Sequence, residues 1–239
     1  MRIKKDCWLI KQPIAHRGLW GDDITENSIS AYKNACNSGY PIEIDVYLTS
    51  DGEIVSFHDD NLKRMTGVDQ KITDKTLAEL KELSLLGSNE KIPTLLEVLE
   101  VCEGKSPLLI EIKNQKNGDA CIKKLVKILK EYKGEFAIQS FNPLYIKKVK
   151  KLAPEFIRGI LGTNKKESDK WIENFILKHM PFNFLIKPDF ISYKYTALPL
   201  KKRKIKNKKV LAWTVTSQEI FDQIKPYTDN IIFENFIPN

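Results

Sequence analysis

Two short segments near the start of the chain bring together residue types that metal-assisted hydrolysis uses. They are residues 14–18, which read IAHRG, and residues 42–60, which read IEIDVYLTSDGEIVSFHDD. In the second segment apolar residues alternate with Glu43 and Asp45, and this period of two predicts a β-strand. Side chains two positions apart in a strand share one face, so the two carboxylates lie side by side. Because like charges repel and no basic residue lies between them, the pair is most simply explained by a divalent cation held by oxygen ligands.

The residues after this predicted strand are typical of a hairpin. The sequence SDGE favours a tight turn, and residues 54–57 form a second short apolar run. With Asp51 and Gly52 as the two central turn residues, facing partners have numbers that sum to about 103. This register places His58 opposite Asp45, whereas a slip of one residue would turn the histidine to the other face.

A lone acid, Glu111, interrupts the apolar run LLIEIK at residues 108–113. Burying an unpaired carboxylate costs on the order of several kcal/mol, so Glu111 needs a cation or a basic partner. Lys113 lies two positions further on and can face the same pocket. A metal ion and an ion pair with Lys113 are therefore the two alternatives for Glu111.

The length and hydropathy of the chain limit its organisation. At 239 residues it suits one globular domain, and a (β/α)₈ barrel typically needs about 250 residues. The start, MRIKKDCWLIKQP, lacks the continuous apolar core and the cleavage site of a secretory signal. No apolar run reaches the roughly 20 residues needed to cross a bilayer. We therefore expect a single soluble domain over residues 1–239 and a cytoplasmic location.

The composition is basic, with a net charge of +8. Only five of the 39 basic residues are arginine, whereas base reading and bidentate phosphate recognition favour arginine, so we expect no nucleic-acid partner. The densest basic run, KKRKIKNKK at residues 201–209, favours a solvated loop or helix face, with an anionic membrane surface as the alternative. The cysteines lack the paired spacing of a zinc or redox site and are expected to be free thiols: Cys7, Cys36, Cys102 and Cys121.

Predicted strands alternate with predicted helices, which is the pattern of a parallel α/β fold. Nine runs have strand character, one more than an eight-stranded barrel holds. Since a tight Asp-Gly turn cannot join parallel neighbours, we predict that residues 54–58 form an accessory antiparallel strand. The nine runs are residues 14–17, 42–48, 54–58, 108–112, 136–139, 157–161, 190–193, 210–215 and 231–234.

Three of the stretches between strands have helical periodicity, and one longer stretch does not. The helices are predicted over residues 28–37, 94–102 and 119–132, the first with Asn27 or Thr25 as its start signal. The residues from 60 to 91 hold one short helical patch, TLAELKEL, among turn residues. We predict that this segment, here called the 60–91 excursion, is a small insertion after the second and third strands, over the barrel mouth.

Seven motifs in order make the sequence resemble the glycerophosphodiester phosphodiesterase family. They are HRG at residues 16–18, TENS at 25–28, IEIDVYLTSDG at 42–52, SFHDDNLKRMTG at 56–67, IPTLLEVLE at 92–100, LLIEIK at 108–113 and AWTV at 212–215. The resemblance runs from about residue 14 to about residue 235 and is dense in the first half. It implies a TIM-type (β/α)₈ barrel, a divalent metal held by three acids, two catalytic histidines, and hydrolysis of glycerophosphodiesters to glycerol 3-phosphate and an alcohol.

The resemblance also implies roles for individual residues. It makes Glu111 the third metal ligand beside Glu43 and Asp45, an all-oxygen set suited to Mg²⁺ or Ca²⁺ and poor for zinc. It makes His16 and His58 the general acid and the general base, without saying which is which. The attacking group is either water or the glycerol 2-hydroxyl, which would leave a cyclic phosphate for water to open.

Three further residues are predicted to bind the substrate. The forked guanidinium of Arg17 suits phosphate oxygens, and Lys113 would add a second positive charge. For Arg17 the alternative is a salt bridge to Glu26. For Trp213, which would line the cleft, the alternative is a place in the core. His179 matches no motif and is expected to be an ordinary surface or loop residue.

The sequence departs from the family pattern in its last strand, which reads DNIIFEN where a threonine and an aspartate are usual. Phe233 and Glu234 leave the substrate preference open. One alternative function is a lipid phosphodiesterase of the same fold, of the lysophospholipase D kind. Another is a basic, non-catalytic binding protein that uses residues 147–151 and 201–209, but this hypothesis leaves the carboxylates and histidines unexplained.

Overall fold

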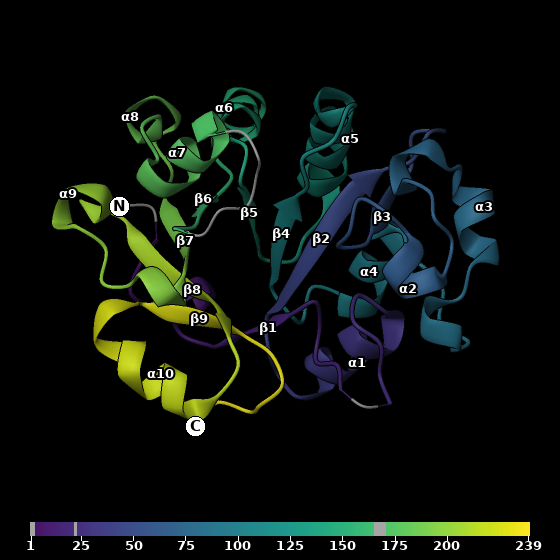
Figure 1. Ribbon diagram of the computed structural model, residues 1–239, viewed down its shortest axis with the longest axis horizontal. Helices are drawn as coiled ribbons and strands as arrows, with labels where there is room; N and C mark the ends of the chain where they lie inside the picture. Colours follow the sequence, from purple (N-terminus) through teal and green to yellow (C-terminus); the bar gives the residue numbers. More distant parts are fainter. Residues whose placement is uncertain (1–2, 22, 165–170) are drawn as a thin grey trace. The chain divides into compact units, whose positions relative to one another are not determined.

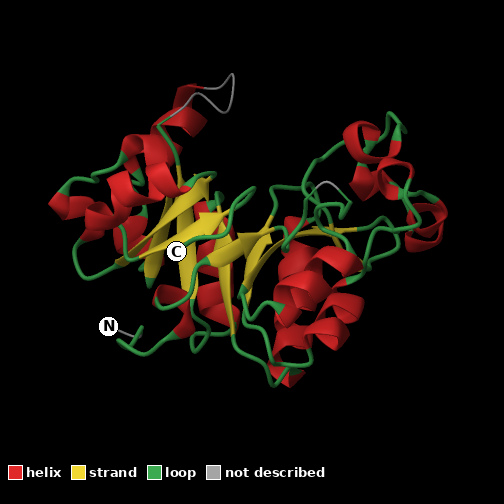
Figure 2. Cartoon of the chain, turned by 90° about the horizontal axis from the view of Figure 1, so that it is seen from below, coloured by secondary structure: helices red, strands yellow, loops and turns green. Residues whose placement is uncertain are grey.

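The structure is a computed structural model that describes residues 3–21, 23–164 and 171–239 (Figure 1). Contacts divide the chain into two compact units. The N-terminal unit is Ala15–Phe136, and the C-terminal unit is Met1–Ile14 together with Ala137–Asn239. In each unit the parallel strands lie side by side and the helices lie outside them (Figures 1 and 2).

Parallel strands form the sheet of the N-terminal unit. The residues of β2 and β4 are all buried, acids included. Strands covered on both faces are normally apolar throughout, so buried acids in them need a specific reason. The register pairs His16 with Glu43 and Asp45 with Glu111, which brings the polar residues of neighbouring strands together. The strands are β1 (Ile14–His16), β2 (Ile42–Leu48) and β4 (Leu108–Ile112).

A further strand, β3 (Ile54–Ser56), pairs with β2 in the antiparallel direction, which confirms the prediction of an accessory strand. The predicted register is wrong by one residue, since Phe57 lies opposite Asp45 and donates its amide hydrogen to Asp45 O at 3.1 Å. The reason is the loop, which has three residues and ends on Gly52 at φ +88° instead of being a two-residue turn. His58 therefore follows β3 and lies outside the ladder.

The predicted helices of the N-terminal unit are present, with small changes at their ends. The first begins after Ser28, whose side chain accepts a hydrogen bond from Ala31 N, so the predicted start signals at Asn27 and Thr25 are wrong. The next begins with a capping box between Thr94 and Glu97, which satisfies two amide donors at once. They are α1 (Ile29–Asn37), α4 (Leu95–Cys102) and α5 (Gly118–Glu131).

The 60–91 excursion lies between β3 and α4 and packs a small core of its own. Leu62, Ile72 and Leu80 are fully buried and contact Tyr47 and Phe57. This packing holds the excursion against β2, the strand that carries Glu43 and Asp45. Its elements are α2 (Lys63–Thr66), the 3₁₀-helix η2 (Ile72–Asp74), α3 (Leu77–Glu82) and the 3₁₀-helix η3 (Leu85–Gly87).

The C-terminal unit contains five parallel strands, each paired with the next along the chain from β5 to β9. Asn230 joins the start of the chain to this sheet, because its side-chain amide donates to Leu9 O at 3.0 Å and to Gln12 O at 2.6 Å. The strands are β5 (Phe136–Ser140), β6 (Arg158–Gly162), β7 (Phe190–Lys194), β8 (Lys209–Val215) and β9 (Asn230–Phe233). The helices are α6 (Pro143–Leu152), α7 (Trp171–His179), α8 (Asn183–Ile186), α9 (Lys202–Ile205) and α10 (Gln218–Ile224), and the remaining 3₁₀-helices are η1 (Trp8–Ile10), η4 (Tyr195–Ala197) and η5 (Lys225–Tyr227).

The two units contribute eight parallel strands that alternate with helices within the described residues, which is the make-up of a (β/α)₈ barrel. The predicted fold class is confirmed. Within the same described ranges, no helix combines the length and the apolar character needed to cross a membrane.

Candidate active site

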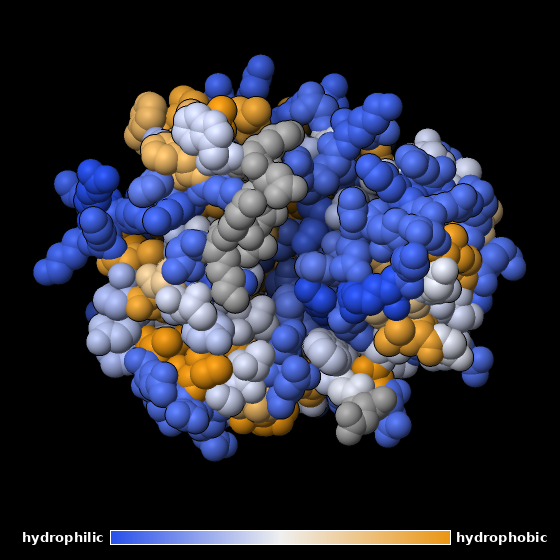
Figure 3. All heavy atoms as spheres, viewed as in Figure 1, coloured by the Kyte–Doolittle hydropathy of each residue, from blue (hydrophilic) through white to orange (hydrophobic). Residues whose placement is uncertain are grey.

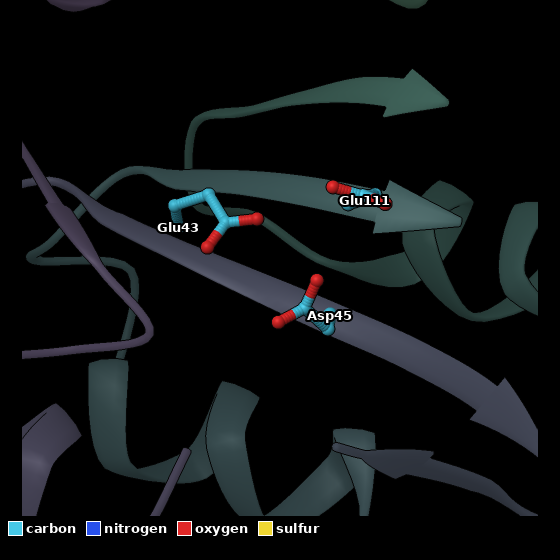
Figure 4. A group of neighbouring side chains, drawn as sticks. All are labelled: Glu43, Asp45 and Glu111. Carbon is cyan, nitrogen blue, oxygen red and sulfur yellow. The ribbon is translucent and has the colours of Figure 1, made fainter. Parts of the chain in front are cut away.

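Three buried carboxylates form the centre of the candidate site. Glu43 and Asp45 come from β2 and are each 1% exposed, and Glu111 comes from β4 and is 7% exposed. One oxygen from each residue lies within 4.8 Å of the other two. Figure 4 shows the three carboxylate groups directed toward one another from the two neighbouring strands. The structure therefore brings the three predicted ligands together.

Two cationic side chains touch this carboxylate cluster. Lys113 Nζ lies 3.2 Å from Asp45 Oδ1 and 3.0 Å from Glu111 Oε1. The ion pair considered as an alternative for Glu111 is thus present. Arg17 Nε lies 3.7 Å from Asp45 Oδ2, and the Arg17 amide donates to Glu43 Oε2 at 3.2 Å. Burial alone would lower the pKa of Lys113, but the charges of Asp45 and Glu111 raise it above its ordinary value.

The environment shifts the pKa values of the two acids of β2 in opposite directions. Burial raises the pKa of Glu43 well above its ordinary value, and the nearby charges of Asp45 and Glu111 raise it further. Burial also opposes ionisation of Asp45, but Lys113, His58 and Arg17 together hold its pKa below the usual range. The protein's own cations therefore stabilise one of these two carboxylates better than the other. A further positive charge in the cluster would stabilise Glu43 as well.

The donor set fits a divalent cation. Asp45 Oδ1 is buried and accepts no hydrogen bond of good geometry from the described residues, so a lone pair is left for another partner. All three donors are carboxylate oxygens, which Mg²⁺ and Ca²⁺ prefer and zinc does not. With every group ionised, three negative charges face Lys113 and an arginine that is shared with Glu26.

The two candidate catalytic histidines lie next to these acids. His16 ends β1, with its Nε2 atom 4.0 Å from Glu43 Oε2. His58 follows β3, and its Nδ1 atom lies 2.6 Å from Asp59 Oδ1. Burial lowers the pKa of His58 below 6.5, the charge of Asp45 opposes this, and Lys113 and Arg17 lower it again. Both rings interact electrostatically with Asp45, although His58 does not lie opposite this acid in the ladder as predicted.

Sequence reasoning missed the salt-bridge network that supports His58 and Arg17. Arg64, in α2 of the excursion, contacts Asp59 Oδ2 through Nε and Glu26 Oε1 through Nη2, both at 2.6 Å. Glu26 Oε1 also lies 2.8 Å from Arg17 Nη1, so the salt bridge predicted as the alternative role of Arg17 exists. The motif string HDDNLKR held this signal, because it carries Asp59 and Arg64, charged residues to which no role was given.

A second set of missed residues fixes Asp45. Asn27 donates from Nδ2 to Asp45 Oδ2 at 3.2 Å and accepts at Oδ1 from the Tyr32 hydroxyl at 2.8 Å. Tyr32 is fully buried and also contacts Ser56 Oγ at 2.6 Å. This chain of hydrogen bonds leads from α1 and β3 to the acid on β2. It restricts the orientation of the Asp45 carboxylate.

The remaining predicted residues belong to the C-terminal unit. Trp213 lies on β8, packs edge-on against Phe141 with ring centroids 5.5 Å apart, and has Lys194 Nζ 5.3 Å from its ring. Its Nε1 atom is buried and has no hydrogen-bond partner among the described residues. His179 is exposed at the end of α7, as predicted. Phe233 is 1% exposed and packs in the core.

Clustered carboxylates that could hold a cation, beside histidine, arginine and lysine side chains, are typical of phosphoric ester hydrolases on a (β/α)₈ fold. The match to a family model makes the assignment specific. The model of the glycerophosphoryl diester phosphodiesterase family matches residues 16–237, and the chain belongs to this family. It is therefore a phosphoric diester hydrolase.

Individual relatives agree with the family match. A glycerophosphodiester phosphodiesterase from Caldanaerobacter subterraneus subsp. tengcongensis is 36% identical, over 93% of this chain and 93% of the relative. A human lysophospholipase D is 34% identical, over 55% of this chain and 45% of the relative. The structure of an Oleispira antarctica phosphodiesterase in complex with the product sn-glycerol-3-phosphate is similar, with a TM-score of 0.78, 27% identity, and coverage of 95% of this chain and 93% of that chain.

Proposed function

We propose that the protein hydrolyses glycerophosphodiesters to glycerol 3-phosphate and an alcohol, with a divalent metal at Glu43, Asp45 and Glu111 and acid–base catalysis by His16 and His58. The observation that carries the proposal is the cluster of three buried carboxylate oxygens within 4.8 Å of one another. Buried acids at such spacing cost free energy unless a cation offsets their repulsion. The family match and the product named for the Oleispira antarctica structure supply the substrate class.

Binding and charge neutralisation are the task of the cationic groups. When bound, Mg²⁺ or Ca²⁺ would neutralise phosphate oxygens and polarise the phosphorus for attack. Arg17 would bind a phosphate oxygen with its forked guanidinium, since Glu26 already fixes one side of that group. Lys113 would contribute a second charge, held in place by Asp45 and Glu111. Trp213 would contact the glycerol or the head group.

The two histidines would divide the proton transfers. The Asp59 carboxylate favours a proton on His58 Nδ1, so the neutral ring has a free lone pair on Nε2. Burial, which lowers the pKa of His58, favours this neutral form. We therefore assign His58 as the general base that takes a proton from water or from the glycerol 2-hydroxyl. His16 would be the general acid that protonates the departing alcohol.

The domain organisation and the location belong to the same proposal. We propose one catalytic domain over residues 1–239, with the 60–91 excursion as its small insertion, in the cytoplasm. The packing of Leu62 and Ile72 of the excursion against Tyr47 of β2 supports its place in that domain.

A lysophospholipase D activity is the second candidate, favoured by the 34% identity to the human enzyme of that name over 55% of this chain. The two functions differ in whether the substrate keeps an acyl chain. One experiment tests both. Purified protein is given glycerophosphocholine, glycerophosphoethanolamine, glycerophosphoglycerol, lysophosphatidylcholine and sphingomyelin, with and without a chelator, and the released phosphate ester and alcohol are measured. We expect the three soluble diesters to be cleaved at comparable rates. A clearly higher kcat/KM for either lipid would support the second candidate instead.

A further inference from the structure

An exposed apolar face lies on the helices of the C-terminal unit, on residues to which no catalytic role is given. Six of the 11 exposed large hydrophobic residues of the described chain fall within residues 171–185. Isolated exposed apolar residues are ordinary, but a group of this kind marks a binding surface. Figure 3 shows hydrophobic atoms gathered over α7 and α8. The residues are Trp171, Ile172, Phe175, Phe182, Phe184 and Leu185.

The pattern on α7 is that of an amphipathic helix with its apolar face outward. Trp171, Ile172 and Phe175 occupy positions i, i+1 and i+4, so they share one helix face. Trp171 is 74% exposed, and Phe184 on α8 is 76% exposed. If α7 only completed the core, its large apolar residues would be buried. Met180, the residue that follows α7, is buried in this way.

A basic cluster adjoins this apolar face. Lys204 Nζ donates to Lys178 O at 2.6 Å, which ties α9 to α7. A hollow of about 590 Å³ lies between them, and its lining includes both Phe184 and basic side chains. Partial burial lowers the pKa of Lys204, and the neighbouring charges of Lys201, Lys178 and Arg203 lower it further. The potential is therefore positive here. The basic residues of the lining are Arg203, Lys204, Lys206 and Lys208.

We propose that this surface, formed by α7, α8 and residues 201–208, binds anionic phospholipid membranes peripherally. The aromatic side chains would enter the head-group region, and the lysines would meet lipid phosphates. The combination of exposed apolar and basic residues selects this partner. Nucleic-acid recognition favours arginine, and Arg203 is the one arginine among the basic residues at 201–208. A second copy of the chain would bring like charges together across the interface.

The test is sedimentation of the full chain with vesicles of phosphatidylcholine alone or mixed with phosphatidylglycerol. We expect binding to the mixed vesicles only, weakened by added salt. The triple variant Lys201→Ala, Lys202→Ala and Lys206→Ala should weaken binding by about fivefold for each charge removed. The double variant Trp171→Ser and Phe184→Ser should weaken it at least tenfold, on the order expected for two buried aromatic side chains.

Matched controls separate this surface from general charge and hydrophobicity. Lys123, Lys127 and Lys130 are exposed on α5, so their triple alanine variant removes the same charge elsewhere. Leu96→Ser with Ile237→Ser removes two other exposed apolar side chains. Both controls should bind vesicles like the unmodified protein. All variants should keep the circular dichroism spectrum of the unmodified protein, which shows that they are folded.

Several results would overturn the proposal. They are failure to bind vesicles that contain phosphatidylglycerol, equal binding to phosphatidylcholine alone, or equal losses in the surface and control variants. Tighter binding to DNA than to vesicles would indicate a nucleic-acid surface instead. Dissociation of a dimer by Trp171→Ser and Phe184→Ser, without any change in vesicle binding, would indicate an interface between two copies. None of these results depends on which diester the enzyme hydrolyses.

Discussion

The two compact units bury charge in different ways. Within the described residues, the N-terminal unit has four buried acids, Glu26, Glu43, Asp45 and Glu111, of which three form one cluster on neighbouring strands. In the described part of the C-terminal unit one charged residue is buried, Arg158 on β6, which donates from Nη1 to Pro154 O at 3.2 Å and to Phe156 O at 3.0 Å.

We interpret this difference as that between a structural charge and the charges of the proposed metal site. Arg158 donates to main-chain carbonyls of the loop that precedes its strand, and those bonds offset its desolvation. The acids of the cluster lie among other acids, and burial raises the pKa of Glu43. Such a cost is typical of a site whose partner comes from outside the chain.

Removal of divalent metal should have the largest effect. A chelator should abolish hydrolysis of glycerophosphocholine, and Mg²⁺ or Ca²⁺ should restore it, because the three carboxylates then lose their counter-charge. Glu43→Gln should raise the metal concentration needed for half-maximal activity while the fold stays intact, since the amide keeps the shape but not the charge. Metal titrations of activity, with circular dichroism for the fold, measure both. Full activity in excess chelator would contradict the assignment.

The histidine substitutions should come next in size. His16→Ala and His58→Ala should each reduce kcat by roughly 10² to 10⁴, the usual contribution of a positioned acid or base. His179→Ala, in the C-terminal unit, should leave kcat unchanged and is the matched control. Because burial lowers the pKa of His58, its neutral form should persist below pH 6.5, and His58→Ala should remove the acidic limb of the pH profile. Similar small losses at all three histidines would refute the acid–base roles.

The strands that carry the three acids, β2 and β4, could be predicted because charged residues within apolar runs are easily recognised in the sequence. The bounds predicted for β2 and β4 were confirmed, and the alternation in IEIDV is enough to place Glu43 and Asp45 on one face of a strand. Both predictions, the bounds of the strands and the shared face of the two acids, depend on a local sequence pattern that tertiary contacts did not override. The eight-strand class also followed, since helices and strands alternate in order.

The hairpin register and the contacts of Arg64 could not be predicted, because both depend on the geometry of loops. One extra loop residue before Gly52 changed the hairpin register, and no propensity argument distinguishes a three-residue from a two-residue connection around Asp-Gly. The contacts of Arg64 with Asp59 and Glu26 join residues 5 and 38 positions apart through the fold of the excursion. Spacing in the sequence carries no information about such contacts.

Arg64→Met should have a smaller effect that acts through position. Without Arg64, Asp59 and Glu26 lose their shared partner, so the His58 ring and the Arg17 guanidinium are held less firmly. We expect a loss of roughly tenfold to hundredfold in kcat with little change in KM, as for a small misplacement of catalytic groups. Steady-state kinetics over a pH series measures this.

The controls for Arg64 lie on the same helix. Lys63→Met breaks an exposed ion pair, in which Lys63 Nζ lies 3.0 Å from Asp69 Oδ2. This variant should leave kcat unchanged. Arg64→Lys should recover part of the activity, because it restores the charge without the fork. An Arg64→Met enzyme with the kcat and pH profile of the unmodified protein would remove Arg64 from the positioning network.

Arg158→Met tests the C-terminal side of the comparison. It should lower the free energy of unfolding by roughly 1–3 kcal/mol, because the carbonyls of Pro154 and Phe156 lose a buried donor. It should leave kcat/KM on glycerophosphocholine unchanged. Urea denaturation and kinetics on the same preparation measure the two quantities. A loss of activity with no loss of stability would mean that the two units do not differ as described.

The smallest effect concerns the pH dependence of the excursion. A backbone hydrogen bond from Thr76, followed by the side chains of Lys75 and Thr76, lowers the pKa of Glu79 from 4.5 to about 2. Because the folded value is the lower one, the contribution of Glu79 to stability is fully present above pH 4.5 and is lost as the pH falls toward 2.

Glu79→Gln should therefore be less stable than the unmodified protein at neutral pH, and the difference should shrink between pH 4.5 and 2. Hydrolysis at neutral pH should not change, since Glu79 is exposed and its hydrogen bonds are those of the capping box of α3. Glu135→Gln, at an exposed position outside the excursion, is the control. A stability difference between Glu79→Gln and the unmodified protein that stays constant over this pH range would show that the ionised capping box does not stabilise the segment that carries Arg64.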